Sequence, residues 1–164
     1  MSAFIYINKI YINIQIRICW EDRIMKYKVV YFSRTGTSKR VAQKISNKLS
    51  CDIIEITDGM NWKGILGFIK GGYYATANKN VNIEVHGNVD SLDEIILVTP
   101  LWAGGLTPAV RAFLKKVSLD KVHLVVTSNG SNIKNPQGFK SLSEIVRTKN
   151  DEDKVIEDLV KKLK

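Results

Sequence analysis

The sequence predicts an α/β fold in which a parallel, doubly wound sheet is covered by helices on both faces, giving three layers. Two observations predict it. Short apolar segments rich in strand-forming residues alternate with stretches whose apolar residues recur at helical spacing. Strands that alternate with helices favour a parallel sheet joined by right-handed crossovers. The length of 164 residues suits a single domain with a sizeable core.

Residues 1–24 differ in residue pattern from the rest of the chain. Isoleucines alternate with polar residues between positions 10 and 18, as in a strand with one apolar face, and the polar residues exclude a signal-peptide core. The tripeptide at 20–22, Trp-Glu-Asp, can be encoded TGG-GAG-GAT, which contains the bacterial ribosome-binding sequence GGAGG shortly before Met25. We therefore expect a domain over 25–164 that starts at Met25, with 1–24 a mis-assigned leader; the intact mass of natively expressed protein tests this.

The first strand, turn and helix organise the rest of the chain. Residues 28–32 are an apolar run of strand formers, residues 33–38 supply four hydroxyl groups and one glycine, and 39–49 follow with helical periodicity. Backbone N–H groups and the helix dipole at such a turn favour an anion, so the hydroxyls and the glycine form a candidate phosphate cradle. The alternative is an ordinary turn whose serine or threonine caps the helix.

The elements that follow are predicted from their apolar patterns. The continuous apolar run 95–98 indicates that the third strand is central, and 81–85 could form a short extended piece. Thr107 and Pro108 are suited to begin the third helix. The predicted strands cover residues 28–32, 51–56, 92–99 and 121–127. The predicted helices cover residues 39–49, 62–75, 109–116 and 151–164.

Three loops follow the carboxyl ends of predicted strands, over residues 33–38, 100–105 and 127–132. All three are rich in glycine, serine, threonine or asparagine. Open parallel sheets bind ligands beyond the carboxyl ends of their strands, at a topological switch point. We therefore favour the phosphate site over the ordinary turn.

Other phosphate and catalytic sites lack the residues that they require. A P-loop needs lysine after its last glycine, whereas Gly36 is followed by Thr37, and a dinucleotide fingerprint needs two further glycines. The first strand ends at Ser33 rather than at the aspartate of a phosphoacceptor domain. His86 and His123 suggest no triad, and no cluster has metal-ligand spacing. A monophosphate at the first loop remains, with a large flat group between Trp102 and the loop at 127–132; the alternative for Trp102 is packing against a helix.

At this point the sequence resembles the flavodoxin family. Residues 31–38, Tyr-Phe-Ser-Arg-Thr-Gly-Thr-Ser, match the phosphate loop of that family, and residues 99–104 followed by Thr107 and Pro108 resemble its flavin-ring loop and the helix after it. The resemblance covers residues 25 to about 132 and resumes in the last helix. It implies strand order 2-1-3-4-5 and a tightly bound FMN, which would do the chemistry while the protein binds and tunes it.

The resemblance also implies a role for each matching residue. Hydroxyl groups would bind the phosphate from Ser33, Thr35, Thr37 and Ser38. Backbone N–H groups would be added by Arg34, Gly36 and Thr37. The ring loop would consist of Pro100, Leu101, Trp102, Ala103 and Gly104, with Trp102 stacked on the isoalloxazine and the backbone of Ala103 and Gly104 near N5 and O4. The pyrimidine side would be lined by Thr127, Ser128, Asn129 and Gly130.

Two features depart from the family. Only residues 131–150 are available for its fourth helix and fifth strand; we expect 139–146 to be the strand, with the helix reduced to a loop, although 139–146 could instead be the helix. The formal net charge is +9, or +8 without the leader of net +1. Flavodoxins that shuttle single electrons at low potential are, by contrast, typically acidic. A positive field would stabilise the anionic reduced flavin and raise its potential.

Composition limits the remaining classes. The lysines are spread along the chain without a run of five or six like charges, which disfavours nucleic acid as a partner, and no apolar stretch would span a membrane. Cys19 and Cys51 suit a reducing cytoplasm. We expect an FMN-binding redox protein that exchanges electrons with a partner protein. The alternatives are a small NAD(P)H- or quinone-linked FMN reductase, and a non-redox module that binds another phosphorylated ligand or a protein.

Overall fold

The computed structural model describes residues 27–60, 73, 81–89, 94–134 and 136–164. The predicted leader and nearly all of the helix predicted over 62–75 lie outside these residues. The strands are β1 (Tyr27–Tyr31), β2 (Asp52–Thr57), β3 (Glu84–His86), β4 (Glu94–Trp102), β5 (Gly105–Leu106), β6 (Val122–Ser128) and β7 (Ser141–Val146). The helices are α2 (Thr37–Leu49), α4 (Pro108–Leu114) and α5 (Glu152–Leu163), with 3₁₀ turns η1 (Leu119–Lys121) and η2 (Arg147–Lys149).

Five parallel strands form the sheet in the order β2-β1-β4-β6-β7. Counted along the chain, this is the predicted order 2-1-3-4-5, and the predicted α/β fold is confirmed. β3 adds an antiparallel strand outside β2, where the sequence indicated only an extended piece. β1 and β4 lie side by side at the centre, with Val29 in register with Ile96.

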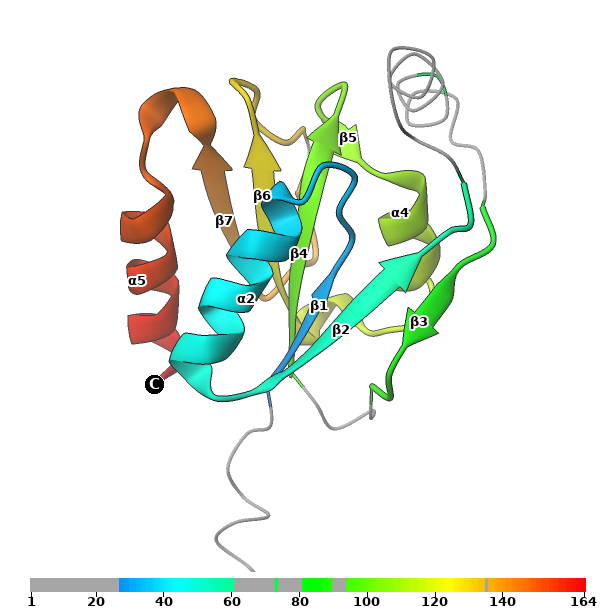
Figure 1. The fold of residues 1–164 in the computed structure, drawn as a ribbon, viewed down its shortest axis with the longest axis horizontal. Coiled ribbons are helices and arrows are strands. Elements are labelled where there is room, and N and C mark those ends of the chain that lie inside the picture. The colour runs from blue at the N-terminus through cyan, green and yellow to red at the C-terminus, as the bar shows by residue number, and fades with distance from the viewer. Residues whose placement is uncertain (1–26, 61–72, 74–80, 90–93, 135) are drawn as a thin grey trace, which may run out of the picture.

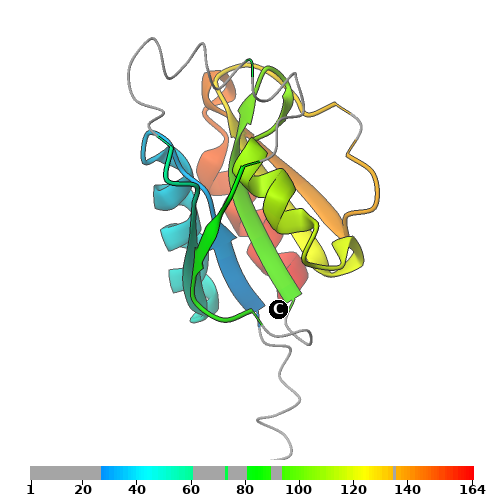
Figure 2. The ribbon, with the colours of Figure 1, turned by 90° about the vertical axis from the view of Figure 1, so that its right-hand side faces the viewer.

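Helices cover the sheet from both faces and make three layers. α2 and α5 lie on one face and α4 on the other, as Figures 1 and 2 show from two directions. The alternation of strand side chains supplies a separate core to each face. Val29, Ile45 and Ile156 belong to the core under α2 and α5, whereas Val30, Leu97 and Phe113 belong to the core under α4.

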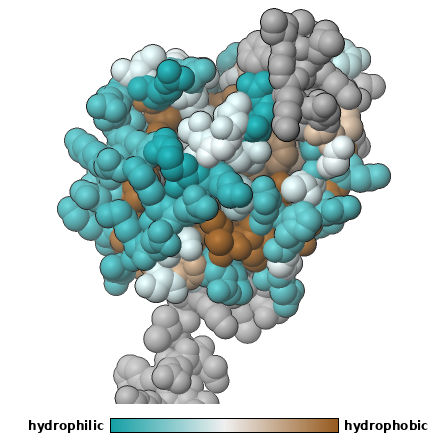
Figure 3. Space-filling view, viewed as in Figure 1, coloured by the Kyte–Doolittle hydropathy of each residue, from teal (hydrophilic) through white to brown (hydrophobic). Residues whose placement is uncertain are grey.

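The face formed by α2 and α5 is mostly hydrophilic (Figure 3). Charges join its two helices: Arg40 binds Glu152 through two hydrogen bonds, and Lys44 Nζ lies 2.9 Å from the same carboxylate. Such exposed pairs add little stability individually, so the apolar faces of the helices account for most of their packing. Within the described residues, no helix is long and apolar enough to cross a membrane.

The last strand resolves the alternative left open at 139–146. β7 occupies Ser141–Val146 and pairs in parallel with β6. None of the described residues between β6 and β7 belongs to a helix. The structure therefore confirms the expected strand and the reduction of the preceding helix to a loop.

The third strand is longer than predicted. β4 continues through Pro100, Leu101 and Trp102, which the sequence placed in a loop. It continues because the chain turns back at once: Leu101 pairs with Leu106 and Trp102 with Gly105 in an antiparallel hairpin. The predicted loop at 100–105 is thus a strand end followed by a tight turn.

Candidate functional site at the carboxyl end of the sheet

The candidate site lies where the chain leaves two neighbouring central strands in opposite directions. After β1 the chain enters α2 on one face, and after β4 it enters α4 on the other (Figure 2). This divergence is the topological switch point at which open parallel sheets bind ligands. All three predicted loops lie at this end of the sheet.

The first loop leads into α2, whose N-terminus is capped by no side chain among the described residues. Gly36 precedes α2 in a left-handed conformation, with φ 89°, and its N–H donates to Ser33 Oγ at 3.1 Å. Among the described residues, no side chain caps α2 and no acidic residue occupies its first turn. By contrast, Thr107 Oγ1 accepts a hydrogen bond from Val110 N, at 3.4 Å, at the start of α4. The first N–H groups of α2 are thus not capped by any described side chain, and such a helix start favours an anion.

The hydroxyl groups of this loop fall into two sets. Thr35 and Thr37 are exposed, and Ser33 is half-buried. Ser38 is only 1% exposed, and its Oγ lies 2.9 Å from Thr127 Oγ1. That buried bond joins the first loop to the end of β6. The exposed hydroxyls are the ones available to a ligand in solution.

The second loop is a two-residue hairpin turn between β4 and β5. Its central residues, Ala103 and Gly104, both have positive φ values, 52° and 76°, which match the right-handed twist of the flanking strands. Trp102 precedes the turn, is half-buried and packs edge-on against Phe32, with ring centroids 5.9 Å apart. The side chain therefore belongs partly to the core under α4, and its stacking on a ligand remains a prediction.

The third loop follows β6 and is held from two sides. Ser128 Oγ donates to Ser131 O within the loop at 2.5 Å, while Asn129 and Gly130 are exposed. Glu144 of β7 accepts from Ile133 N at 2.8 Å and also from the neighbouring Asn132 side chain. These bonds fix the loop without a helix behind it.

Contacts between the loops bring the predicted residues together. Besides the Ser38–Thr127 bond, the N–H of Lys134 donates to Gly104 O at 3.1 Å, which joins the chain just after the third loop to the second loop. The Phe32–Trp102 contact joins the residue just before the first loop to the second loop. Lys134 and Glu144 were not predicted as site residues, because their roles depend on loop contacts that no local motif records.

The donor set fits a phosphate monoester attached to an aromatic group. Exposed hydroxyls of Thr35 and Thr37 lie beside the uncapped start of α2, and Arg34 adds a positive charge. Trp102 lies at the end of the neighbouring strand, where it is half-buried rather than enclosed. Within the described residues, no group of three histidine, cysteine or acidic side chains is placed to hold a metal ion.

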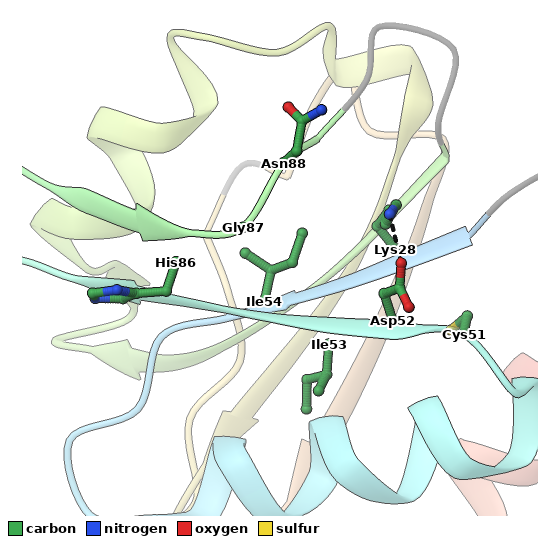
Figure 4. A pocket seen from close by; sticks show the side chains of 8 residues that line it. All are labelled: Lys28, Cys51, Asp52, Ile53, Ile54, His86, Gly87 and Asn88. Carbon is green, nitrogen blue, oxygen red and sulfur yellow. Dashed lines mark hydrogen bonds and ion pairs between the residues drawn. The ribbon is translucent and has the colours of Figure 1, made fainter.

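A shallow cavity of about 530 Å³ lies at the opposite end of the sheet (Figure 4). Lys28 Nζ and Asp52 Oδ2 form an ion pair there at 2.7 Å. Gly87 lies so close to Ile54 that a Cβ at this glycine would come within 2.9 Å of Ile54 Cγ1. None of the predicted site residues lines this cavity.

Comparisons with solved structures agree with the fold. The chain is similar to a flavoprotein in complex with FMN from Lactobacillus acidophilus, with 18% identity, a TM-score of 0.56, and coverage of 79% of this chain and 97% of that one. A candidate flavoprotein from Bacteroides eggerthii has 19% identity and a TM-score of 0.60, and the match covers 83% and 98% of the two chains.

A candidate flavoprotein from Bacteroides uniformis gives 18% identity and a TM-score of 0.59, and the match covers 82% of this chain and 97% of that chain. No protein-family model and no curated protein matches the sequence. The likeness to these structures, together with the strand order, shows a flavodoxin-like fold.

Proposed function

We propose that this chain binds FMN non-covalently at the carboxyl end of its sheet and transfers electrons through it. The observation that carries the proposal is the meeting of three loops at the switch point between β1 and β4, beside a helix N-terminus that no described side chain caps. A similar structure contains FMN, which supports the choice of ligand.

The residues divide the binding between phosphate and ring. The phosphate would be held by the first amides of α2 and by the hydroxyls of Ser33, Thr35 and Thr37. The hydrogen bond between Ser38 and Thr127 would hold the first loop against the end of β6. Trp102 and the turn that follows it would contact the ring. When bound, FMN supplies the redox chemistry; the protein orients it and sets its electrostatic surroundings.

The phosphate assignment is tested by Thr35→Ala. Thr35 is exposed, so its removal leaves the core intact. Loss of one hydrogen bond to a charged phosphate should weaken FMN binding about tenfold or more. The measurement is the Kd of FMN by fluorescence titration, with Gln43→Ala on the exposed face of α2 as the matched control. An unchanged Kd in Thr35→Ala contradicts the phosphate assignment.

A reductase is the second candidate function. FMN in the carrier needs a partner reductase, whereas a small NAD(P)H- or quinone-linked enzyme oxidises NAD(P)H unaided. We favour the carrier, because every residue that we assign to the candidate site has a role in binding FMN and we assign none to NAD(P)H or to a quinone. NAD(P)H oxidation by the purified, FMN-loaded protein alone would identify the reductase. Colourless protein that added FMN does not restore would instead favour the non-redox module.

A further inference from the structure

We propose that three exposed cations beside the candidate flavin site, Lys134, Arg147 and Lys149, form a docking surface for a redox protein with an acidic face. We call these residues the cationic rim. Docking serves electron transfer only if FMN is bound, so this inference rests on the function proposed above. Each docking event would pass one electron, so one partner centre is oxidised as the flavin gains that electron.

Lys134 is placed at the ring loop by two contacts. Its backbone N–H donates to Gly104 O at 3.1 Å, and its side-chain Cε lies 3.4 Å from the position that a Cβ on Gly104 would occupy. The side chain therefore runs along the turn at 103–104 and remains exposed. Its charge lies next to the backbone that is predicted to approach the flavin ring.

Arg147 and Lys149 flank the third loop from the other side. Both belong to η2, which follows β7 directly, and both are exposed. Thr148, between them, lies against this loop: its Oγ1 is 3.9 Å from the position of a Cβ on Gly130. Thus the rim spans two segments that border the same candidate site.

Two carboxylates close to the rim in the sequence or across the third loop accept hydrogen bonds from neighbouring residues. Both oxygens of Glu144 accept hydrogen bonds from residues 132 and 133, and Asp151 Oδ1 accepts one from Val146 N at 3.3 Å. Within the described part of the chain, no carboxylate forms an ion pair with a rim residue. On the face of α2 and α5, by contrast, Arg40 and Lys44 are paired with acidic residues. Glu144 and Asp151 keep their negative charge but are half-buried, whereas all three rim cations are exposed, so the exposed side chains of the rim itself are positive.

The spread of the cationic rim suits the binding of a protein surface better than the binding of a small anion. The three cations lie on two segments and are exposed, so their field extends over a broad area of the carboxyl edge. Exposed charges of this kind steer an oppositely charged partner and accelerate its association, and the effect falls as salt screens them. An acidic redox protein would thereby be oriented with its own centre towards the flavin.

The test uses a plant-type [2Fe–2S] ferredoxin as the acidic probe protein. Its dissociation constant with the FMN-loaded chain is measured by titration calorimetry at ionic strengths of about 0.01 M and about 0.15 M. The rim variant is Lys134→Glu/Arg147→Glu/Lys149→Glu. The matched control, Lys161→Glu/Lys162→Glu/Lys164→Glu, changes the net charge equally at exposed residues of the C-terminal end of α5.

We expect the rim variant to weaken ferredoxin binding about tenfold or more at low salt and the control to weaken it less than about threefold. The milder variant Lys134→Gln/Arg147→Gln/Lys149→Gln should change binding in the same direction, and retained FMN absorbance shows that each variant is folded. Equal losses in rim and control variants, or no ferredoxin binding by the unmodified chain at low salt, would overturn the docking surface. Failure to take up FMN contradicts the proposed function instead, and ferredoxin binding to the unloaded chain still reports on the rim.

Discussion

Gly104 is the residue on which the geometry of the ring loop depends most directly. It occupies the second position of the β4–β5 turn with φ 76°, where an L side chain is strained, and its carbonyl accepts the N–H of Lys134. Gly105 follows it in β5, and a Cβ there would meet only ordinary contact, 3.7 Å from Trp102 O. The turn therefore requires glycine at 104 for its backbone conformation, whereas position 105 has room for a side-chain methyl group.

We predict that Gly104→Ala lowers the free energy of unfolding by about 1–2 kcal/mol, the cost of a left-handed alanine. The added methyl group would also contact the flexible end of the Lys134 side chain, at 3.4 Å, which adds little to this cost. Gly105→Ala should change stability by less than about 0.5 kcal/mol. Urea denaturation of the two variants measures both values. Equal effects would mean that the conformation at 104 imposes no special cost.

Sequence reasoning at this scale identified residue types but not their orientation. It counted the hydroxyls of residues 33–38 correctly, yet nothing in the local pattern separates the buried Ser38 from the exposed Thr35. The partner of Ser38 is Thr127, 89 positions later in the chain, so the distinction depends on tertiary structure. Phosphate binding by the exposed hydroxyls stays a prediction.

At the scale of elements, a buried polar cluster joins the amino ends of β4, β6 and β7. His123 Nε2 lies 2.9 Å from Glu94 Oε2, its Nδ1 lies 2.7 Å from Ser141 Oγ, and Lys140 also binds Glu94. The ring of Tyr27, from β1, packs edge-on against His123. The cluster lies at the end of the sheet opposite the candidate site and therefore acts on the fold.

This cluster predicts acid sensitivity. Burial alone would raise the pKa of Glu94, but the hydrogen bonds from Lys140 and His123 outweigh it and hold the pKa below its ordinary value of 4.5. A carboxylate with a lowered native pKa contributes stability above its unfolded-state pKa and loses it as the pH falls through the native value. The chain should therefore lose stability progressively below pH 4.5 as Glu94 becomes protonated.

We expect Glu94→Gln to lower the free energy of unfolding at neutral pH by about 1–3 kcal/mol, because it weakens hydrogen bonds of a buried charge. Its stability should then fall less steeply between neutral pH and acid than that of the unmodified chain. Glu157→Gln, at an exposed position of α5, is the control and should have little effect. Parallel stability curves for Glu94→Gln and the unmodified chain would contradict the assignment.

Helices and strands were predicted correctly where the apolar pattern is strong. The prediction failed where pairing with another strand determines where a strand ends. The alternation of strands and helices predicted the parallel sheet, and the resemblance to the flavodoxin family implied the strand order. The extension of β4 through Trp102 was missed, because it depends on β5, which has only two residues. The strand at 139–146 was favoured but not decided, since a short apolar run suits a helix as well as a strand; pairing with β6 makes it β7.

For the whole molecule, net charge is the property with the clearest functional consequence. The chain carries a formal charge of +9, and an unscreened positive charge 10 Å from an anion in water stabilises it by about 0.4 kcal/mol. The field should therefore favour the anionic reduced flavin and raise the potential of the couple that forms it. We predict that this potential falls as ionic strength rises, as a redox titration at two salt concentrations would show. A potential as low as that of the acidic shuttles, or one indifferent to salt, would contradict this.

FMN binding is the central claim, and equilibrium titration of the purified, flavin-free protein with FMN tests it most directly. We predict a yellow, stoichiometric complex that survives desalting, with the flavin spectrum altered by the Trp102 side chain and changed again in Trp102→Ala. Protein that stays colourless after incubation with FMN and desalting would contradict the account.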